Sequence, residues 1–102
     1  MTDYINCIVI DGPFIEKTSV ENSQLALEAE LMGAVDFAEL GQNIVVLFNE
    51  DAISLHLRPN VLGSYGKLIF CKRIFWEFSS LNESEQDQLL AKLHEAITDT
   101  GV

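Results

Sequence analysis

The segment from residue 68 to residue 78 restricts the possible folds of this chain more than any other feature. It reads LIFCKRIFWEF, with apolar side chains at both odd and even positions. In a regular strand, alternate side chains point to opposite faces of the sheet. One face receives Leu68, Phe70, Ile74, Trp76 and Phe78, and the other receives Ile69, Cys71 and Phe75 alongside Val45 and Leu47. Because both faces are apolar, both need cover. One helix on each face would supply it; otherwise a second copy or another protein must cover the open face.

Three further strands are predicted before this segment. Residues 4–10 form a β-branched, apolar run that stops at the turn tripeptide Asp11-Gly12-Pro13. Residues 43–48 and 52–58 predict two more strands, which Asn49-Glu50-Asp51 joins as a hairpin because these are turn-forming residues. The second of these strands alternates between apolar and polar residues, so we expect one of its sides to face water.

The C-terminal half predicts a loop, a strand region and a helix. Residues 59–66 are rich in residues that break regular structure, and residues 67–78 predict one long strand or two short strands that break near Lys72-Arg73. Asn82-Glu83-Ser84-Glu85 has the spacing of a capping box, and its carboxylates suit the positive end of a helix. We expect the final helix to begin there. Its core stripe is Leu89, Leu90, Leu93 and Ile97.

A second capping-box spacing, Thr18-Ser19-Val20-Glu21, predicts the start of an earlier helix. The composition remains helix-forming up to Leu40, and Gly41 supplies a C-terminal stop. At 100° per residue, a set of apolar residues falls on one stripe, which we expect to be buried. This set is Leu27, Leu31, Ala34, Val35 and Ala38.

The predicted order is β-α-β-β-β-α, which belongs to the α+β class with a mainly antiparallel sheet of three to five strands and two helices. At 102 residues, the chain has the length of one domain spanning residues 1–102. Its last five elements have the order found in double-stranded RNA-binding domains. Those domains present lysines at the start of the final helix, where this chain carries Glu83, Glu85 and Asp87. These carboxylates would repel RNA, so the order of the elements does not predict RNA binding.

Charge excludes several classes of partner. The chain has 16 Asp and Glu against 6 Lys and Arg, a formal net charge of −10. Direct nucleic-acid binding needs a basic footprint, and an anionic membrane surface would repel this protein. No signal peptide is visible and the longest apolar run is far too short for a membrane span, so we expect a cytoplasmic protein. Two cysteines, Cys7 and Cys71, lie in apolar runs and are expected to be buried free thiols in a reducing compartment.

No pattern in the sequence predicts catalysis or a bound cofactor. His56 and His94 are far apart, and there is neither a Cys-x-x-Cys nor a Gly-rich phosphate loop. Cys71 lies in an apolar run, where burial raises the pKa of a thiol and makes it inert. We expect no catalytic residue, no metal ligand and no cofactor, and therefore not an enzyme.

The negative charge is concentrated in the N-terminal part of the chain. Residues 1–57 hold ten acidic residues and one basic residue, and residues 18–57 hold no basic residue at all. On a straight helix, four carboxylates fall within about 80° of one another, with Leu25 and Met32 beside them. They are those of Glu21, Glu28, Asp36 and Glu39. Glu50 and Asp51 add two more at the predicted hairpin tip. The predicted partner-binding residues are Glu21, Glu28, Met32, Asp36, Glu39, Glu50 and Asp51.

Two functional hypotheses follow, beside the simpler explanation that the charge only keeps the protein soluble. The first is a small acidic inhibitor of a basic protein, most concretely a bacterial immunity protein or antitoxin. It would neutralise a nuclease-type toxin by occupying the toxin's nucleic-acid-binding surface. The alternative is an assembly or secretion chaperone or adaptor that acts through the aromatic segment. In that case Phe75 and Trp76 would form a partner surface or the contact of a homodimer.

Overall fold

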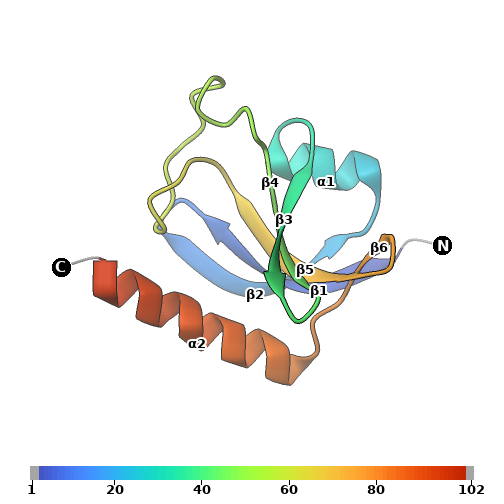
Figure 1. Cartoon of the computed structure of the whole chain (residues 1–102). Coiled ribbons are helices and arrows are strands. Elements are labelled where there is room, and N and C mark those ends of the chain that lie inside the picture. Colours follow the sequence, from blue (N-terminus) through green and yellow to red (C-terminus); the bar gives the residue numbers. More distant parts are fainter. Residues whose placement is uncertain (1–2, 101–102) are drawn as a thin grey trace.

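The computed structural model describes residues 3–100 and has six strands and two helices (Figure 1). The elements are β1 (Tyr4–Asp11), β2 (Phe14–Glu21), α1 (Gln24–Leu31), β3 (Asp36–Gly41), β4 (Ile44–Phe48), β5 (Leu68–Ile74), β6 (Glu77–Ser79) and α2 (Glu83–Thr100). All strand pairings are antiparallel, so the predicted α+β class with two helices is confirmed. The observed order is β-β-α-β-β-β-β-α, with one more strand than the largest number expected.

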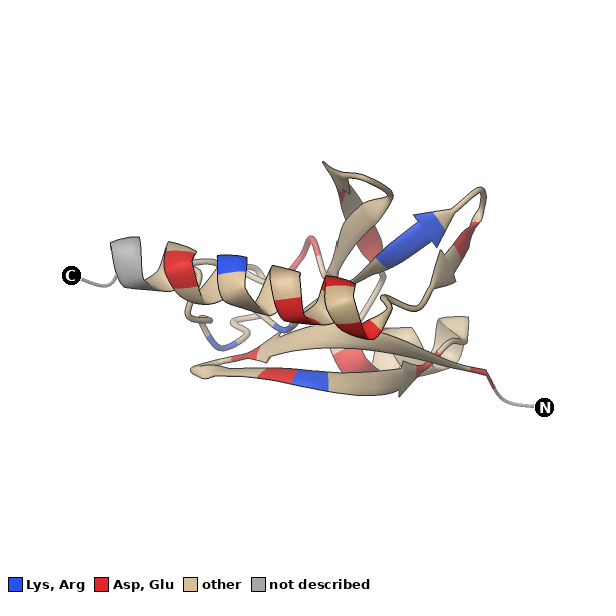
Figure 2. Cartoon of the chain, turned by 90° about the horizontal axis from the view of Figure 1, so that it is seen from below, with Lys and Arg blue, Asp and Glu red and all other residues tan. Residues whose placement is uncertain are grey.

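The two-sided apolar segment forms the middle of the sheet. The strand order is β2-β1-β5-β4-β3, and β6 pairs with the end of β5. On one face, a buried cluster joins Cys7, Val45, Leu47, Ile69 and Cys71 to Leu27 and Leu31 of α1. On the other face, Ile8, Ile10, Leu68 and Phe70 pack with Leu81 and Leu93. The expectation of one helix on each face is therefore confirmed (Figure 1). Seen from below, α2 lies in front of the sheet (Figure 2).

The single first helix expected between residues 18 and 40 is wrong. Thr18 lies in β2 opposite Cys7 of β1, because the Gly12-Pro13 turn folds the chain back on itself after β1. The N-cap of α1 is Ser23, whose hydroxyl accepts a hydrogen bond from the Ala26 amide at 3.2 Å. The helix ends at Leu31, and the chain then enters β3. Consequently Ala34, Val35 and Ala38 are not part of a helical stripe.

The strand expected over residues 52–58 is also wrong. That segment forms consecutive turns, with hydrogen bonds such as Leu55 N to Asp51 O at 2.9 Å, and Ile53 and Leu55 are exposed. Residues 67–78 form two strands, as one of the two alternatives allowed, but the break falls at Phe75 and Trp76 rather than at Lys72-Arg73. Because the chain turns there, Phe78 packs against the α1-side cluster instead of the face that regular alternation predicts.

The capping box of α2 is confirmed. The Glu85 amide donates to Asn82 Oδ1 at 2.8 Å, and the Asn82 amide donates to Glu85 Oε1 at 2.9 Å. Lys72 of β5 also forms an ion pair with Glu85 at 2.7 Å, which fastens the start of α2 to the sheet. These contacts lower the pKa of the Glu85 carboxyl, chiefly through the Asn82 backbone hydrogen bond and then through Lys72.

Candidate functional site

Three carboxylates that the sequence singled out lie together at one end of β3 and β4. Asp36 begins β3 opposite Phe48, the last residue of β4, and Glu50 and Asp51 follow shortly after that residue. When protonated, the Glu50 carboxyl donates a hydrogen bond to the Asp36 carboxylate. This bond, with the negative charges of Asp36 and Asp51, raises the pKa of Glu50. Within residues 3–97, no ion pair neutralises these three groups, which we call the carboxylate cluster.

The buried side chain of Asn49 positions the carboxylate cluster. Its amide nitrogen donates to the carbonyls of Leu31 and Met32, each at 3.2 Å, and so satisfies carbonyls that the end of α1 leaves without helical partners. Its Oδ1 accepts from the Asp51 amide at 2.9 Å. Gly33 permits this approach, because a Cβ there would lie 2.6 Å from the Asn49 amide nitrogen. The sequence predicts only a turn at Asn49, because nothing near it in the chain indicates that its side chain reaches α1.

An exposed apolar ridge runs along the outer side of α1 and ends beside the carboxylate cluster. Leu27 and Leu31 face the sheet, so Leu25 and Ala29 lie on the opposite side of the helix by helical spacing. The C-cap residue Met32 follows with a φ of 63°. Leu25 is 80% exposed and Met32 is 66% exposed. We call Leu25, Ala29 and Met32 the helix ridge. Helices with apolar residues on both sides are usually buried on both sides. In α1, the sheet covers the inner side, and the helix ridge is left exposed.

The structure separates the other predicted residues. Glu28 lies on α1 next to the helix ridge, whereas Glu21 ends β2 and accepts a hydrogen bond from the Ser23 hydroxyl at 3.0 Å. Glu39 lies on β3 and lines a hollow with Arg73, near the turn between β3 and β4. The expected common helix face for Glu21, Glu28, Asp36 and Glu39 is wrong, because these residues belong to two strands and one helix.

Phe75 and Trp76 form the two-residue turn between β5 and β6, which we call the aromatic tip. They are 86% and 87% exposed, the highest values among the large apolar side chains of the described chain. Phe75 has a φ of 57°, in the left-handed region that bulky side chains rarely adopt. The Arg73 guanidinium carbon lies 4.5 Å from the centre of the Phe37 ring and 5.7 Å from that of Trp76. A cation thus bridges the aromatic tip to β3.

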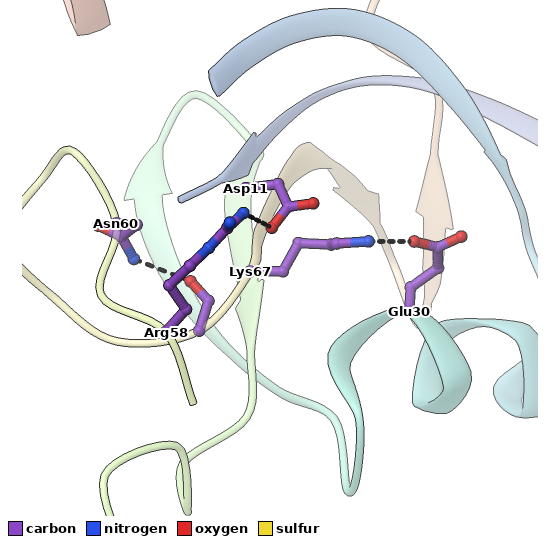
Figure 3. A network of polar contacts seen from close by, with 6 residues as sticks. Asp11, Glu30, Arg58, Asn60 and Lys67 are labelled. Atoms are coloured by element: carbon purple, nitrogen blue, oxygen red, sulfur yellow. Dashed lines mark hydrogen bonds and ion pairs between the residues drawn. The ribbon is translucent and has the colours of Figure 1, made fainter. Parts of the chain in front are cut away.

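A pocket of about 370 Å³ lies between α1, the end of β1 and the loop before β5. Arg58 forms an ion pair with Asp11 at 3.2 Å, and Lys67 forms one with Glu30 at 2.8 Å (Figure 3). Gly12 has a φ of 57°, which favours glycine, and a Cβ there would require the Arg58 guanidinium, 2.5 Å away, to move. Both cations are therefore paired. Arg58 connects the loop to β1 and Lys67 connects it to α1, so neither leaves an unpaired charge for a ligand.

The two cysteines and His56 show no arrangement that indicates catalysis. Cys7 and Cys71 are free and fully buried, as expected, and burial raises the pKa of each thiol to about 12. His56 is exposed in the loop after β4, whereas Cys71 is buried in β5. Among the described residues, no group of three or more His, Cys, Asp or Glu side chains is arranged to hold a metal ion.

Neither helix in the described part of the chain is both long and apolar enough to cross a membrane. Comparisons with protein-family models, with curated proteins and with solved structures found no match for this chain.

Proposed function

We propose that this protein is a small acidic inhibitor that binds a basic protein. In the concrete form of the proposal, the partner is a nuclease-type toxin that the protein neutralises as an immunity protein or antitoxin. The observation that carries the proposal is the carboxylate cluster of Asp36, Glu50 and Asp51 beside the exposed helix ridge. Together these two features form the proposed binding surface.

The carboxylate cluster is unfavourable in the free protein. Like charges held close together repel, and the negative charges of Asp36 and Asp51 contribute, after the hydrogen bond to Asp36, to the raised pKa of Glu50. A lysine or arginine from a partner would remove the repulsion and gain charge-assisted hydrogen bonds in its place. Binding of a cationic side chain would therefore lower the electrostatic free energy of the carboxylate cluster.

The helix ridge supplies the apolar part of such an interface. Protein interfaces combine an apolar centre with a polar rim, and charged residues are depleted at the centre. Leu25 and Met32 provide exposed apolar area, while Glu28 and the carboxylate cluster border it. This arrangement suits a folded protein partner better than a small ion.

The large negative charge of this protein is complementary to the basic surface of a nuclease-type partner. Enzymes that act on nucleic acids carry Lys- and Arg-rich surfaces that hold phosphates. A protein with a net charge of −10 and clustered carboxylates can occupy such a surface. Acidic positions outnumber basic ones over the ribbon in Figure 2. Long-range attraction between the two proteins would also speed their association, and salt would weaken it.

The test is a binding measurement with the basic proteins encoded next to this protein's gene, purified and titrated by calorimetry. The cluster variant combines Asp36→Asn, Glu50→Gln and Asp51→Asn. The control variant combines Glu16→Gln, Glu83→Gln and Glu95→Gln, which are exposed residues of β2 and α2. Both variants lose the same charge, so a difference between them reports the location of the carboxylates and not the net charge.

We expect the cluster variant to bind at least about tenfold more weakly than the wild type, and the control variant to bind nearly as well. Inhibition of the partner's nuclease activity should decline in parallel. Equal affinities for the two variants would contradict the proposed surface. Failure of every basic neighbour to bind would contradict the proposed function itself.

A further inference from the structure

The aromatic tip consists of residues that are unfavourable for the turn they form. Two-residue hairpin turns favour glycine or asparagine where φ is positive, yet Phe75 occupies that position with a φ of 57°. A non-glycine residue held in this region carries strain, which persists where the surroundings impose it and often marks functional sites. Neither Phe75 nor Trp76 contributes appreciably to the core, because both are almost fully exposed. The free protein therefore gains little stability from these two large side chains.

The tip is nevertheless held in a defined arrangement. Arg73 lies over the rings of Phe37 and Trp76, and Phe37 meets Phe78 edge to face with ring centres 5.9 Å apart. The Arg73 amide donates to the Asn43 carbonyl at 2.8 Å, which ties the hairpin to the turn between β3 and β4. A side chain ordered before binding loses less conformational entropy when it is buried by a partner.

Carboxylates border the tip. Trp76 lines a hollow of about 380 Å³ together with Asp3, Ser23, Gln24 and Glu77. Asp3 and Glu77 are exposed and take part in no ion pair within residues 3–97. The neighbouring cation, Arg73, faces aromatic rings. The border that the hollow presents to a partner is consequently negative.

We propose that Phe75 and Trp76 form an aromatic anchor that inserts into an apolar pocket bordered by lysine or arginine on a basic protein partner. This inference rests on the proposed function, because the partner is taken to be the basic protein that this chain inhibits. A second copy of this chain would bring Asp3 and Glu77 against the same acidic surroundings. An anionic membrane would meet the same repulsion. Charge complementarity therefore favours a basic protein over either of them.

One partner can reach both the anchor and the carboxylate cluster. The hollow beside Trp76 includes Gln24, the first residue of α1, and the carboxylate cluster lies by the other end of the helix. An eight-residue helix spans about 12 Å. A typical interface covers roughly 800 Å² on each protein, which is ample for this distance. The helix ridge lies between the two sites.

The anchor can be followed directly because Trp76 is the only tryptophan of the chain. In the free protein we expect the emission of a solvent-exposed indole. Relative to free tryptophanamide, caesium should quench it more strongly and iodide less strongly, because the border is acidic. On titration with the basic neighbouring protein, in a tryptophan-free form, we expect the emission to shift to shorter wavelength. The emission of the free protein and its sedimentation give the reference state.

Substitutions separate the anchor from the rest of the surface. Trp76→Ala should weaken binding by at least about 30-fold, as truncation of a buried tryptophan at an interface commonly does, and Trp76→Phe should restore part of the affinity. The matched control is Phe14→Ala, which removes an exposed aromatic residue at the turn between β1 and β2. Phe75→Gly should weaken binding while raising the denaturation midpoint, because glycine accepts the positive φ. That variant excludes misfolding as the cause of lost affinity.

Each outcome decides a specific point. If the cluster variant loses affinity while Trp76→Ala binds like Phe14→Ala, the anchor is wrong and the proposed function stands. If Trp76→Ala loses affinity and the cluster variant does not, the anchor stands and the acidic surface is wrong. A wild-type dimer that Trp76→Ala dissociates, or a blue shift on vesicles containing phosphatidylserine, would overturn the assignment of the partner. Caesium and iodide quenching in the same ratio as for free tryptophanamide would contradict the acidic border of the hollow. If no basic neighbour binds, both proposals fail.

Discussion

Asn49 connects three parts of the chain with one side chain. It closes the end of α1, fixes the start of the segment that carries Glu50 and Asp51, and follows directly after β4. All of its side-chain polar atoms have partners although the residue is buried. Buried polar groups that are fully bonded define one geometry, because any displacement leaves a group unpaired.

We therefore expect Asn49→Ala to lower the free energy of unfolding by about 2 kcal/mol, since it leaves buried backbone groups of α1 and of the following turn without partners. Urea denaturation of the two proteins measures this difference. Asn6→Ala, at an exposed position on β1, is the control and should stay near the wild type. A loss no greater than that of the control would show that Asn49 does not hold the two segments together.

Glu50 should destabilise the free protein at neutral pH. Because its folded pKa is raised above the ordinary value, chiefly by Asp36, its contribution to stability is fully present below the ordinary pKa and is lost as pH rises through the folded pKa. At pH 7, Glu50→Gln should consequently raise the urea midpoint while weakening the binding of a basic partner. At pH 4 or below, the midpoints of the two proteins should converge. A midpoint for Glu50→Gln that is lower than the wild type at pH 7 would contradict the repulsion.

At the scale of elements, the two helices form for different reasons. The long α2 carries its own start signal, and its capping box is present as the sequence predicts. The eight-residue α1 is too short to be stable alone in water. Packing of Leu27 and Leu31 on the sheet, together with caps from Ser23 and Asn49, stabilises it.

The cap of α2 can be tested separately from its packing. Asn82→Ala removes the acceptor for the Glu85 amide and should lower the free energy of unfolding by about 1 kcal/mol, whereas Asn82→Asp keeps an acceptor and should retain most of it. Thermal and urea denaturation measure both variants. The lowered pKa of Glu85 adds stability that is present above its ordinary pKa and is lost as pH falls through the folded pKa. Equal stability of the alanine and aspartate variants would refute the cap.

At the scale of the whole molecule, the charge has opposite effects on folding and on binding. A net charge of −10 disfavours the compact state through self-repulsion and attracts a basic partner. The described part of the chain has ion pairs such as Lys17 with Asp87, which are too exposed to offset much of this repulsion.

Salt should therefore move the two properties in opposite directions. Raising NaCl from about 0.02 M to about 0.5 M shortens the screening length severalfold, so we expect a higher melting temperature for the free protein and a weaker complex with a basic partner. Calorimetric melting and titration across the same salt series measure both. Affinity that is independent of salt would mean that the carboxylates do not drive association.

The apolar pattern of residues 68–78 predicted a strand region that needs cover on both faces, because alternation assigns side chains to faces without knowledge of the partners. The place of β5 in the middle of the sheet came only from the strand pairings. The Asn82–Glu85 spacing predicted the start of α2, because the contacts of a helix cap join residues that are close in the chain. Both features depend on short-range geometry.

The tertiary structure alone decided the segments whose conformation depends on distant residues. Thr18 joins a strand because Cys7 pairs with it, and residues 36–41 become β3 because β4 lies beside them. The same pairing brings Asp36 to Glu50, which the helical interpretation had placed on a different element. The sequence by itself determined that the protein is acidic and that residues 68–78 have apolar side chains on both faces. Strand pairing and the reach of Asn49 decided which carboxylates meet, because those contacts join residues far apart in the chain.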